Sequence, residues 1–149
     1  MNKEADELVK RAAIGLVELA NHANVTWDEV FLMYQRDESQ SGGTQTYRNG
    51  RELKYFDFDF DDESAEELES TVWETLNTLF DVIAQQKGKS PSACVINVTN
   101  DYDFKIKFSY GELEGMSIRL LDIGEFQSFY NLAEVDIPES IKKAQKDGL

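Results

Sequence analysis

Residues 55–69 read Tyr-Phe-Asp-Phe-Asp-Phe-Asp-Asp-Glu-Ser-Ala-Glu-Glu-Leu-Glu, and the pattern changes from strand to helix within them. The first half alternates aromatic and acidic residues, which is typical of a strand because successive side chains point to opposite faces of a sheet. We therefore expect a strand from Arg51 to Phe60 with an aromatic and an acidic face. The aromatic face, which packs on the core, consists of Phe56, Phe58 and Phe60. The acidic face consists of Asp57, Asp59 and Asp61.

A long helix is predicted directly after this strand, from Ser64 to Gln86. Ser64 and Glu67 have the spacing of a capping box, in which two side chains bond free backbone N–H groups at the start of a helix. Apolar residues then recur at the spacing of one helix face. They are Leu68, Val72, Leu76, Leu79, Phe80 and Ile83. Gly88 ends this pattern, and Pro91 prevents its continuation.

Upstream, the sequence predicts a helix, a central strand and a hairpin. The helix runs from Glu4 to Ala23, with an apolar stripe and acidic residues in its first turn. The strand from Trp27 to Arg36 is apolar on both faces, so we expect it in the middle of the sheet. Residues 37–43 are polar and rich in glycine and serine, which predicts a loop. A short strand, Thr44 to Arg48, leads to Asn49-Gly50, a dipeptide that favours a tight hairpin turn.

Downstream, three further strands are predicted, followed by a short helix. The strands are Ala93 to Thr99, Phe104 to Tyr110 and Met116 to Leu121, and Pro138 to Lys146 can form the helix. The order α-β-β-β-α-β-β-β-α predicts an α+β fold, in which a mainly antiparallel sheet of about five to six strands is packed by two long helices. We expect residues 1–149 to form a single domain.

The composition restricts the partners and the compartment. The formal net charge is -14, which opposes direct binding to nucleic acid or anionic lipid and favours a basic partner. The sequence has no long apolar run and no signal-peptide pattern at its start, and Cys94 is its single cysteine. These features predict a cytoplasmic protein in a reducing compartment.

The spacing Asp57-x-Asp59-x-Asp61 matches the start of a calcium-binding EF-hand loop. The rest of that loop does not match, because Asp62 stands where the loop needs glycine and Leu68 stands where it needs a bidentate glutamate. We therefore expect neither a metal nor a cofactor.

Helix capping and the helix dipole account for part of the local charge, namely the acids from Asp62 onward, such as Glu63. They do not account for the row Asp57, Asp59 and Asp61. This row is either a solvated surface or a binding surface for a basic partner.

Catalytic patterns are sparse. His22 is the only histidine, which is too few for a zinc site or a histidine-based triad, and it is expected at the surface near a helix end. Cys94 lies in an apolar strand and is expected to be a buried small hydrophobe. No glycine-rich phosphate loop or nucleophile motif occurs. The sequence thus predicts a protein without enzymatic activity, although a small hydrolase that uses carboxylates is a remote alternative.

Residues 95–113 read Val-Ile-Asn-Val-Thr-Asn-Asp-Tyr-Asp-Phe-Lys-Ile-Lys-Phe-Ser-Tyr-Gly-Glu-Leu. This segment resembles the one in YezG/EsaG-type immunity proteins where a strand, a polar turn and a Phe-Lys-Ile-x-Phe-x-Tyr strand follow a long helix. The upstream order of elements is similar as well, so that the resemblance in layout covers residues 5–121. The family carries an aromatic-rich tail, which Phe126, Phe129 and Tyr130 match only in part.

The resemblance implies a bacterial, cytoplasmic antitoxin that binds and neutralises a secreted toxin, often a nuclease, within a polymorphic toxin system. The residues agree with this in one independent respect, because an acidic surface can occupy the basic groove in which a nuclease binds phosphates. The predicted binding surface consists of Asp57, Asp59, Asp61, Asp62 and Glu63, with Tyr55, Tyr47 or Tyr102 as aromatic anchors. The alternative is an acidic adaptor or a DNA-mimicking module that binds a different protein.

Overall fold

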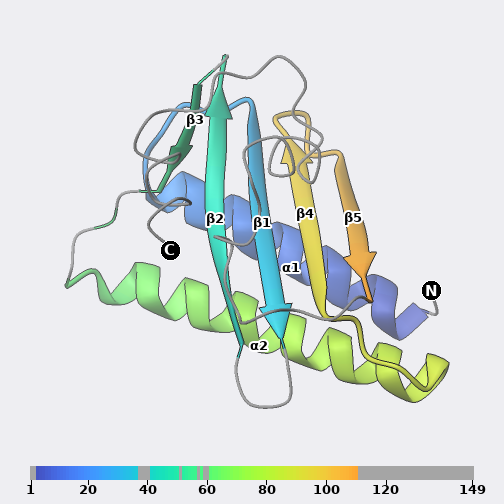
Figure 1. The fold of residues 1–149 in the computed structure, drawn as a ribbon. Helices are drawn as coiled ribbons and strands as arrows, with labels where there is room; N and C mark the ends of the chain where they lie inside the picture. Colours follow the sequence, from blue (N-terminus) through green and yellow to red (C-terminus); the bar gives the residue numbers. More distant parts are fainter. Residues whose placement is uncertain (1–2, 37–40, 51, 57, 59–60, 111–149) are drawn as a thin grey trace, which may run out of the picture.

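A computed structural model describes residues 3–36, 41–50, 52–56, 58 and 61–110 (Figure 1). Within them the chain forms two helices and five strands. In chain order these are α1 (Lys3–His22), β1 (Glu29–Arg36), β2 (Ser41–Asn49), β3 (Glu52–Tyr55), α2 (Glu63–Lys87), β4 (Ala93–Thr99) and β5 (Phe104–Ser109). The strands form one antiparallel sheet in the order β3-β2-β1-β4-β5. The predicted α+β fold is therefore confirmed, whereas the predicted strand at 116–121 and helix at 138–146 lie outside the described residues.

Strand β1 occupies the centre of the sheet, as its apolar sequence predicts. It pairs with β2 on one side and with β4 on the other. Side chains on both of its faces are buried: Leu32 and Tyr34 on one face and Phe31 and Met33 on the other are at most 1% exposed. A strand that is shielded on both faces has no position for a polar side chain in its middle, which explains the continuous apolar run.

Both helices pack on the same face of the sheet, and Figure 1 shows them together behind the strands. The apolar stripes predicted from helical spacing form the core here, since Leu16 and Leu19 of α1 and Leu76 and Phe80 of α2 are fully buried. The sheet contributes Val30, Leu32, Tyr34, Cys94, Ile96 and Val98 to the same cluster. Trp27 and Trp73 are partly buried against it.

Helix α2 begins at a different cap from the predicted one. Asp62 is the N-cap, and its Oδ1 accepts a hydrogen bond from the backbone N–H of Ala65 at 3.0 Å. Ser64 already lies inside the helix, so its predicted role as the cap is wrong. An aspartate caps a helix as well as a serine does, and here it precedes the serine. The other end agrees with the prediction, because Gly88 adopts the left-handed conformation with φ 74° and donates to the Ala84 carbonyl.

Strand β2 is longer than predicted. Ser41, Gly42 and Gly43 were expected in a loop, but they pair with the last residues of β1 and extend β2 to Ser41. The physical reason lies at Gly43, which faces Tyr34 across the ladder and passes beneath the ring of Trp73. A Cβ at position 43 would overlap the Met33 carbonyl oxygen and the Trp73 ring, so only a residue without a side chain fits here. A glycine that resembles a loop residue in sequence is therefore a packing residue of the strand.

The hairpin and strand β3 also differ from the prediction. Asn49 is the last residue of β2 and pairs with Glu52, so the turn begins at Gly50 rather than at Asn49. Strand β3 ends at Tyr55 instead of Phe60. Directly after the strand, Phe56 stacks on Tyr47 at 5.2 Å between ring centroids. Phe56 therefore packs through its ring and is not part of the strand pairing that was predicted here. The core-facing prediction is confirmed for Phe56 and Phe58, whereas Phe60 lies outside the described residues.

Strands β4 and β5 match the sequence pattern closely. Strand β4 has the predicted bounds, and the exposed Lys105 and Lys107 of β5 alternate with the half-buried Ile106 and Phe108. The turn between the strands is closed by Thr99, whose backbone N–H donates to the Asp103 carbonyl. The Thr99 hydroxyl also donates to the Asp101 carboxylate, and this bond lowers the pKa of Asp101.

Candidate functional site

The predicted acidic row is only partly within the described residues. Asp57 and Asp59 lie outside them. Asp61 is exposed in the turn that precedes α2, and is therefore not on a strand face as predicted. Its neighbour Asp62 caps the helix, and Glu63 is the first and exposed residue of α2. The three described acids thus surround a helix N-terminus, where the helix dipole favours negative charge.

Asp62 has a structural role that the sequence does not reveal. In addition to capping α2, its Oδ2 lies 2.8 Å from Nε2 of His22, the last residue of α1. The hydrogen bond from Ala65 and the contact with His22 lower the pKa of the Asp62 carboxyl. His22 is near a helix end and at the surface, as predicted, and it connects the end of α1 to the start of α2. Asp62 therefore has a structural role, which is separate from the binding role that the sequence predicted for it.

A substitution at Asp62 tests this role. The Asp62→Ala variant is expected to lower the melting temperature at pH 7 by about 2–4 °C, because the cap is lost. The folded-state pKa lies below the usual 3.8, so this contribution is complete above pH 3.8 and disappears as the pH falls through the lower folded-state value. Thermal unfolding of both proteins from pH 7 down to pH about 2 should show the difference shrinking in that range. Asp61→Asn is the matched control, and an equal loss of stability in that variant would contradict the capping role.

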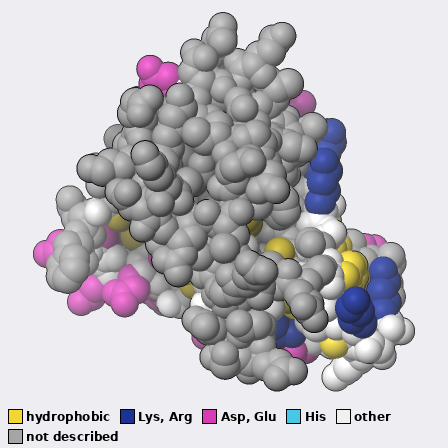
Figure 2. Space-filling view, viewed as in Figure 1, with side chains coloured by type: hydrophobic (Ala, Val, Ile, Leu, Met, Phe, Trp, Pro, Cys, Tyr) yellow, Lys and Arg dark blue, Asp and Glu magenta, His cyan; other side chains and the backbone are white. Residues whose placement is uncertain are grey.

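The acidic residues around the first turns of α2 form a surface whose negative charge no ion pair within the described residues neutralises. Asp61, Glu63, Glu66 and Glu67 are exposed, and none has an ion-pair partner among the residues that the structure describes. We call these four residues the acidic end of α2. The sequence contains no lysine or arginine between Lys54 and Lys87. Figure 2 shows acidic side chains gathered at the left of the view, where α2 begins, and lysine or arginine side chains at the right.

The carboxylate of Glu69 marks the inner border of this surface. Its side chain is half-buried, and burial followed by repulsion from Glu66 raises its pKa. Burial is the larger cause, and only the smaller one, repulsion from Glu66, reflects the negative charge of the neighbouring acidic residues. The exposed carboxylates of the acidic end of α2 make the electrostatic potential at this surface negative.

The three candidate aromatic anchors have different environments. Tyr47 is 9% exposed and belongs to the core, which excludes it as a surface anchor. Tyr55 is half-buried, burial raises its pKa, and its hydroxyl is buried with no hydrogen-bond partner in the described part of the chain. Tyr102 is 66% exposed, in the turn between β4 and β5. Of the three, only Tyr102 presents most of its ring to solvent.

Sequence reasoning missed two exposed apolar side chains, Ile14 and Phe104. Ile14 lies on α1 outside the core-facing stripe, and this isolated position within a polar face was the available signal. Phe104 belongs to the alternating pattern of β5, which predicts a buried ring, yet it is 39% exposed. Together with Tyr102, these two side chains line one groove.

The described residues offer little for catalysis. Cys94 is buried, as predicted, and burial strongly raises the pKa of its thiol, so the nucleophilic thiolate does not form at neutral pH. Among the residues described, no three His, Cys, Asp or Glu side chains are arranged to hold a metal ion. The described helices are all too short or too polar to cross a membrane.

Comparison with models of known protein families gives no match, and comparison with curated proteins finds no significantly similar one. The resemblance to YezG/EsaG-type immunity proteins therefore stays a prediction from residues 95–113 and from the order of elements.

Proposed function

We propose that this protein is an immunity protein that neutralises a toxin with a basic active-site groove, as a nuclease toxin has. The observation that carries the proposal is the acidic end of α2, whose exposed carboxylates have no ion-pair partner in the described part of the chain. The predicted row Asp57, Asp59 and Asp61 leads directly into this surface along the chain. The helix dipole stabilises part of this charge. The exposed carboxylates also repel one another and contribute no packing, so a basic partner supplies a reason for their concentration that the dipole alone does not.

The physical basis of inhibition is competition for the phosphate-binding groove. A nuclease groove is basic because it neutralises the nucleic-acid backbone, and a protein surface with closely spaced carboxylates can replace those phosphates. Such complementarity mainly accelerates association and sets orientation, while apolar contacts determine how long the complex lasts. The proposal thus needs both an acidic surface and an apolar anchor.

The test begins with a search of the neighbouring genes for a toxin domain, which is then purified and mixed with a variant that carries Asp57→Asn, Asp59→Asn and Asp61→Asn. At low salt the variant is expected to associate about 10-fold more slowly, because steering by charge is reduced. At high salt the two proteins should associate at similar rates, because screening removes the long-range attraction. Stopped-flow association rates and inhibition of the toxin provide the measurements.

The matched control removes the same number of charges elsewhere, by Glu4→Gln, Asp6→Asn and Glu7→Gln at the exposed start of α1. This control should associate like the unchanged protein apart from a small effect of net charge. Equal rates for all three proteins at low salt would refute the row Asp57, Asp59 and Asp61 as a binding surface. If the purified protein instead binds a DNA-binding protein and leaves the toxin active, the adaptor alternative replaces the proposal.

A further inference from the structure

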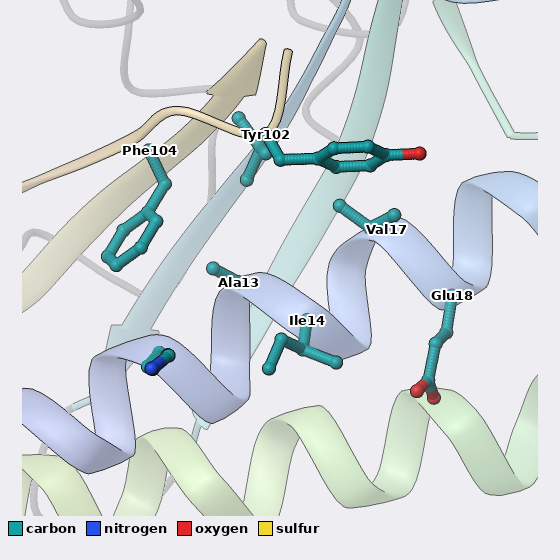
Figure 3. A pocket seen from close by; sticks show the side chains of 8 residues that line it. Ala13, Ile14, Val17, Glu18, Tyr102 and Phe104 are labelled. Atoms are coloured by element: carbon teal, nitrogen blue, oxygen red, sulfur yellow. The ribbon is translucent and has the colours of Figure 1, made fainter. Parts of the chain in front are cut away.

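An apolar groove of about 330 Å³ runs between α1 and the β4–β5 turn. Figure 3 shows Ala13, Ile14 and Val17 along α1, with Tyr102 and Phe104 on the other side. Among the described residues, the large exposed hydrophobic side chains are Ile14, Tyr102 and Phe104, and all of them line this groove. Isolated exposed hydrophobics are common, but their convergence on one groove is typical of an interaction site.

The backbone at Tyr102 supports the same interpretation. Tyr102 adopts φ 67°, a left-handed conformation that favours glycine or asparagine and disfavours a bulky side chain. The centroid of its ring lies 6.5 Å from that of Trp27, in an edge-on arrangement. Tyr102 nevertheless remains 66% exposed, so packing does not require an aromatic residue here. A tyrosine held in a strained turn with its ring in solvent indicates a role in binding.

The shape of the groove favours a protein segment over a small molecule. Ile14 and Tyr102 are more than half exposed, so a small ligand would leave their outer surfaces wet, whereas another protein surface can cover them. From Lys10 to Glu18, which lie at the two ends of the lining, α1 rises about 12 Å. Helical anchors at positions i and i+7 are about 10.5 Å apart, so one apolar helix stripe fits along the groove.

The charges around the groove indicate which charge a complementary helix carries. Glu18 lies at one end, and the exposed Asp101 and Asp103 flank Tyr102 in the turn. Among the described residues that line the groove, Lys10 is the only cation. Basic residues beside the apolar stripe can pair with these acids, and an arginine or lysine can also lie over the Tyr102 ring. A helix that complements the groove is therefore basic as well as amphipathic.

We infer that this groove binds an amphipathic, basic α-helix of the protein partner, with Ile14, Tyr102 and Phe104 as the anchors. This inference rests on the proposed function, because the same basic toxin supplies the helix. The acidic end of α2 accelerates encounter, and the groove prolongs the complex. The two surfaces can be tested separately.

The probe is a fluorescein-labelled synthetic helix of about 15 residues, with leucines at i, i+3, i+4 and i+7 and lysines beside them. Fluorescence anisotropy with the full chain measures its affinity. Ile14→Ser and Tyr102→Asn are each expected to weaken binding by about 30-fold, the effect of losing a central anchor. Both positions are exposed and asparagine tolerates the backbone at 102, so thermal unfolding should show intact folding.

A scrambled peptide with the same composition but no stripe is the control for charge alone. Equal binding of the two peptides, or unchanged binding by both single variants, would overturn the inference. The variant with Asp57, Asp59 and Asp61 changed to asparagine should keep peptide binding. If that variant alone loses it, the peptide occupies the acidic surface, and the groove is refuted while the proposed function stands.

Two other occupants of the groove, a small molecule and a second copy of the chain, would give different experimental results. A small apolar molecule that co-purifies with the protein and blocks the peptide would assign the groove to a ligand. Dimerisation that Ile14→Ser abolishes, measured by sedimentation, would assign the groove to a second copy of the chain. Either result overturns the inference.

Discussion

Replacing Phe80 with alanine is expected to lower the free energy of unfolding by about 3–5 kcal/mol, because a large buried ring is removed and the surrounding structure closes the cavity only in part. Phe80 is fully buried in α2. Its ring lies edge-on to Tyr34 at 5.2 Å and to Phe108 at 6.3 Å between centroids, and the Arg36 guanidinium lies 5.3 Å from its centroid. One substitution therefore removes contacts among the helix, the central strand and β5.

Urea unfolding followed by circular dichroism measures this loss. The matched control is Phe104→Ala, the same chemical change at a ring that is 39% exposed, with an expected cost of about 1 kcal/mol. Phe80→Leu retains most of the volume and should cost less than about 1.5 kcal/mol. If Phe80→Ala and Phe104→Ala were equally costly, the ring of Phe80 would not be the centre of the core.

The parts of the fold that the sequence predicted well are those in which one local pattern determines the structure. The stripe of Leu76, Leu79 and Phe80 repeats at helical spacing, and it predicts both the helix and the face that it buries. Strand β4 is bounded by Pro91 and a polar turn, so its ends follow from turn chemistry. In these segments, local preference and tertiary packing agree.

The parts that were predicted wrongly depend on contacts between distant residues. Gly43 has the local properties of a loop residue, but it pairs with Tyr34 of β1 and lies against Trp73 of α2. Ser64 and Asp62 are both good helix caps, and the contact of Asp62 with His22 accompanies its role as the actual cap. Local sequence does not contain that information, because Trp73 and His22 are about 30 or more residues away along the chain.

The candidate site divides in the same way. A surplus of carboxylates is visible in the sequence, so the position of the acidic end of α2 could be predicted. The prediction that a strand face carries Asp61 was wrong, because Asp61 lies in the turn before α2. The groove could not be predicted, because Ile14 on α1 and Tyr102 in the β4–β5 turn come together only through the packing of α1 on the sheet. Surfaces made by distant segments require the fold before they can be recognised.

The Gly43→Val substitution is expected to destabilise the protein by about 3 kcal/mol, at the upper end of the range for overpacked sites. A Cβ at position 43 would overlap the Met33 carbonyl oxygen and lie 2.7 Å from Cη2 of Trp73. Neither neighbour can move easily, because Met33 belongs to the central strand and Trp73 stacks on Tyr34 at 5.5 Å between centroids. The added side chain would therefore push β2 away from β1 or α2 away from the sheet.

Gly42→Val is the matched control for this substitution, since a Cβ at position 42 meets no atom within 4 Å. It should change the free energy of unfolding by less than about 0.5 kcal/mol, as is usual at exposed positions. Combining Gly43→Val with Trp73→Phe removes the ring atoms that the new side chain meets, and should recover part of the lost stability through a coupling of about 1 kcal/mol. Urea unfolding of the unchanged protein, Gly43→Val, Trp73→Phe and the double variant gives this coupling directly. Equal stability of the Gly42 and Gly43 variants would show that β2 does not pass beneath Trp73, and that residues 41–43 form the loop that their composition predicts.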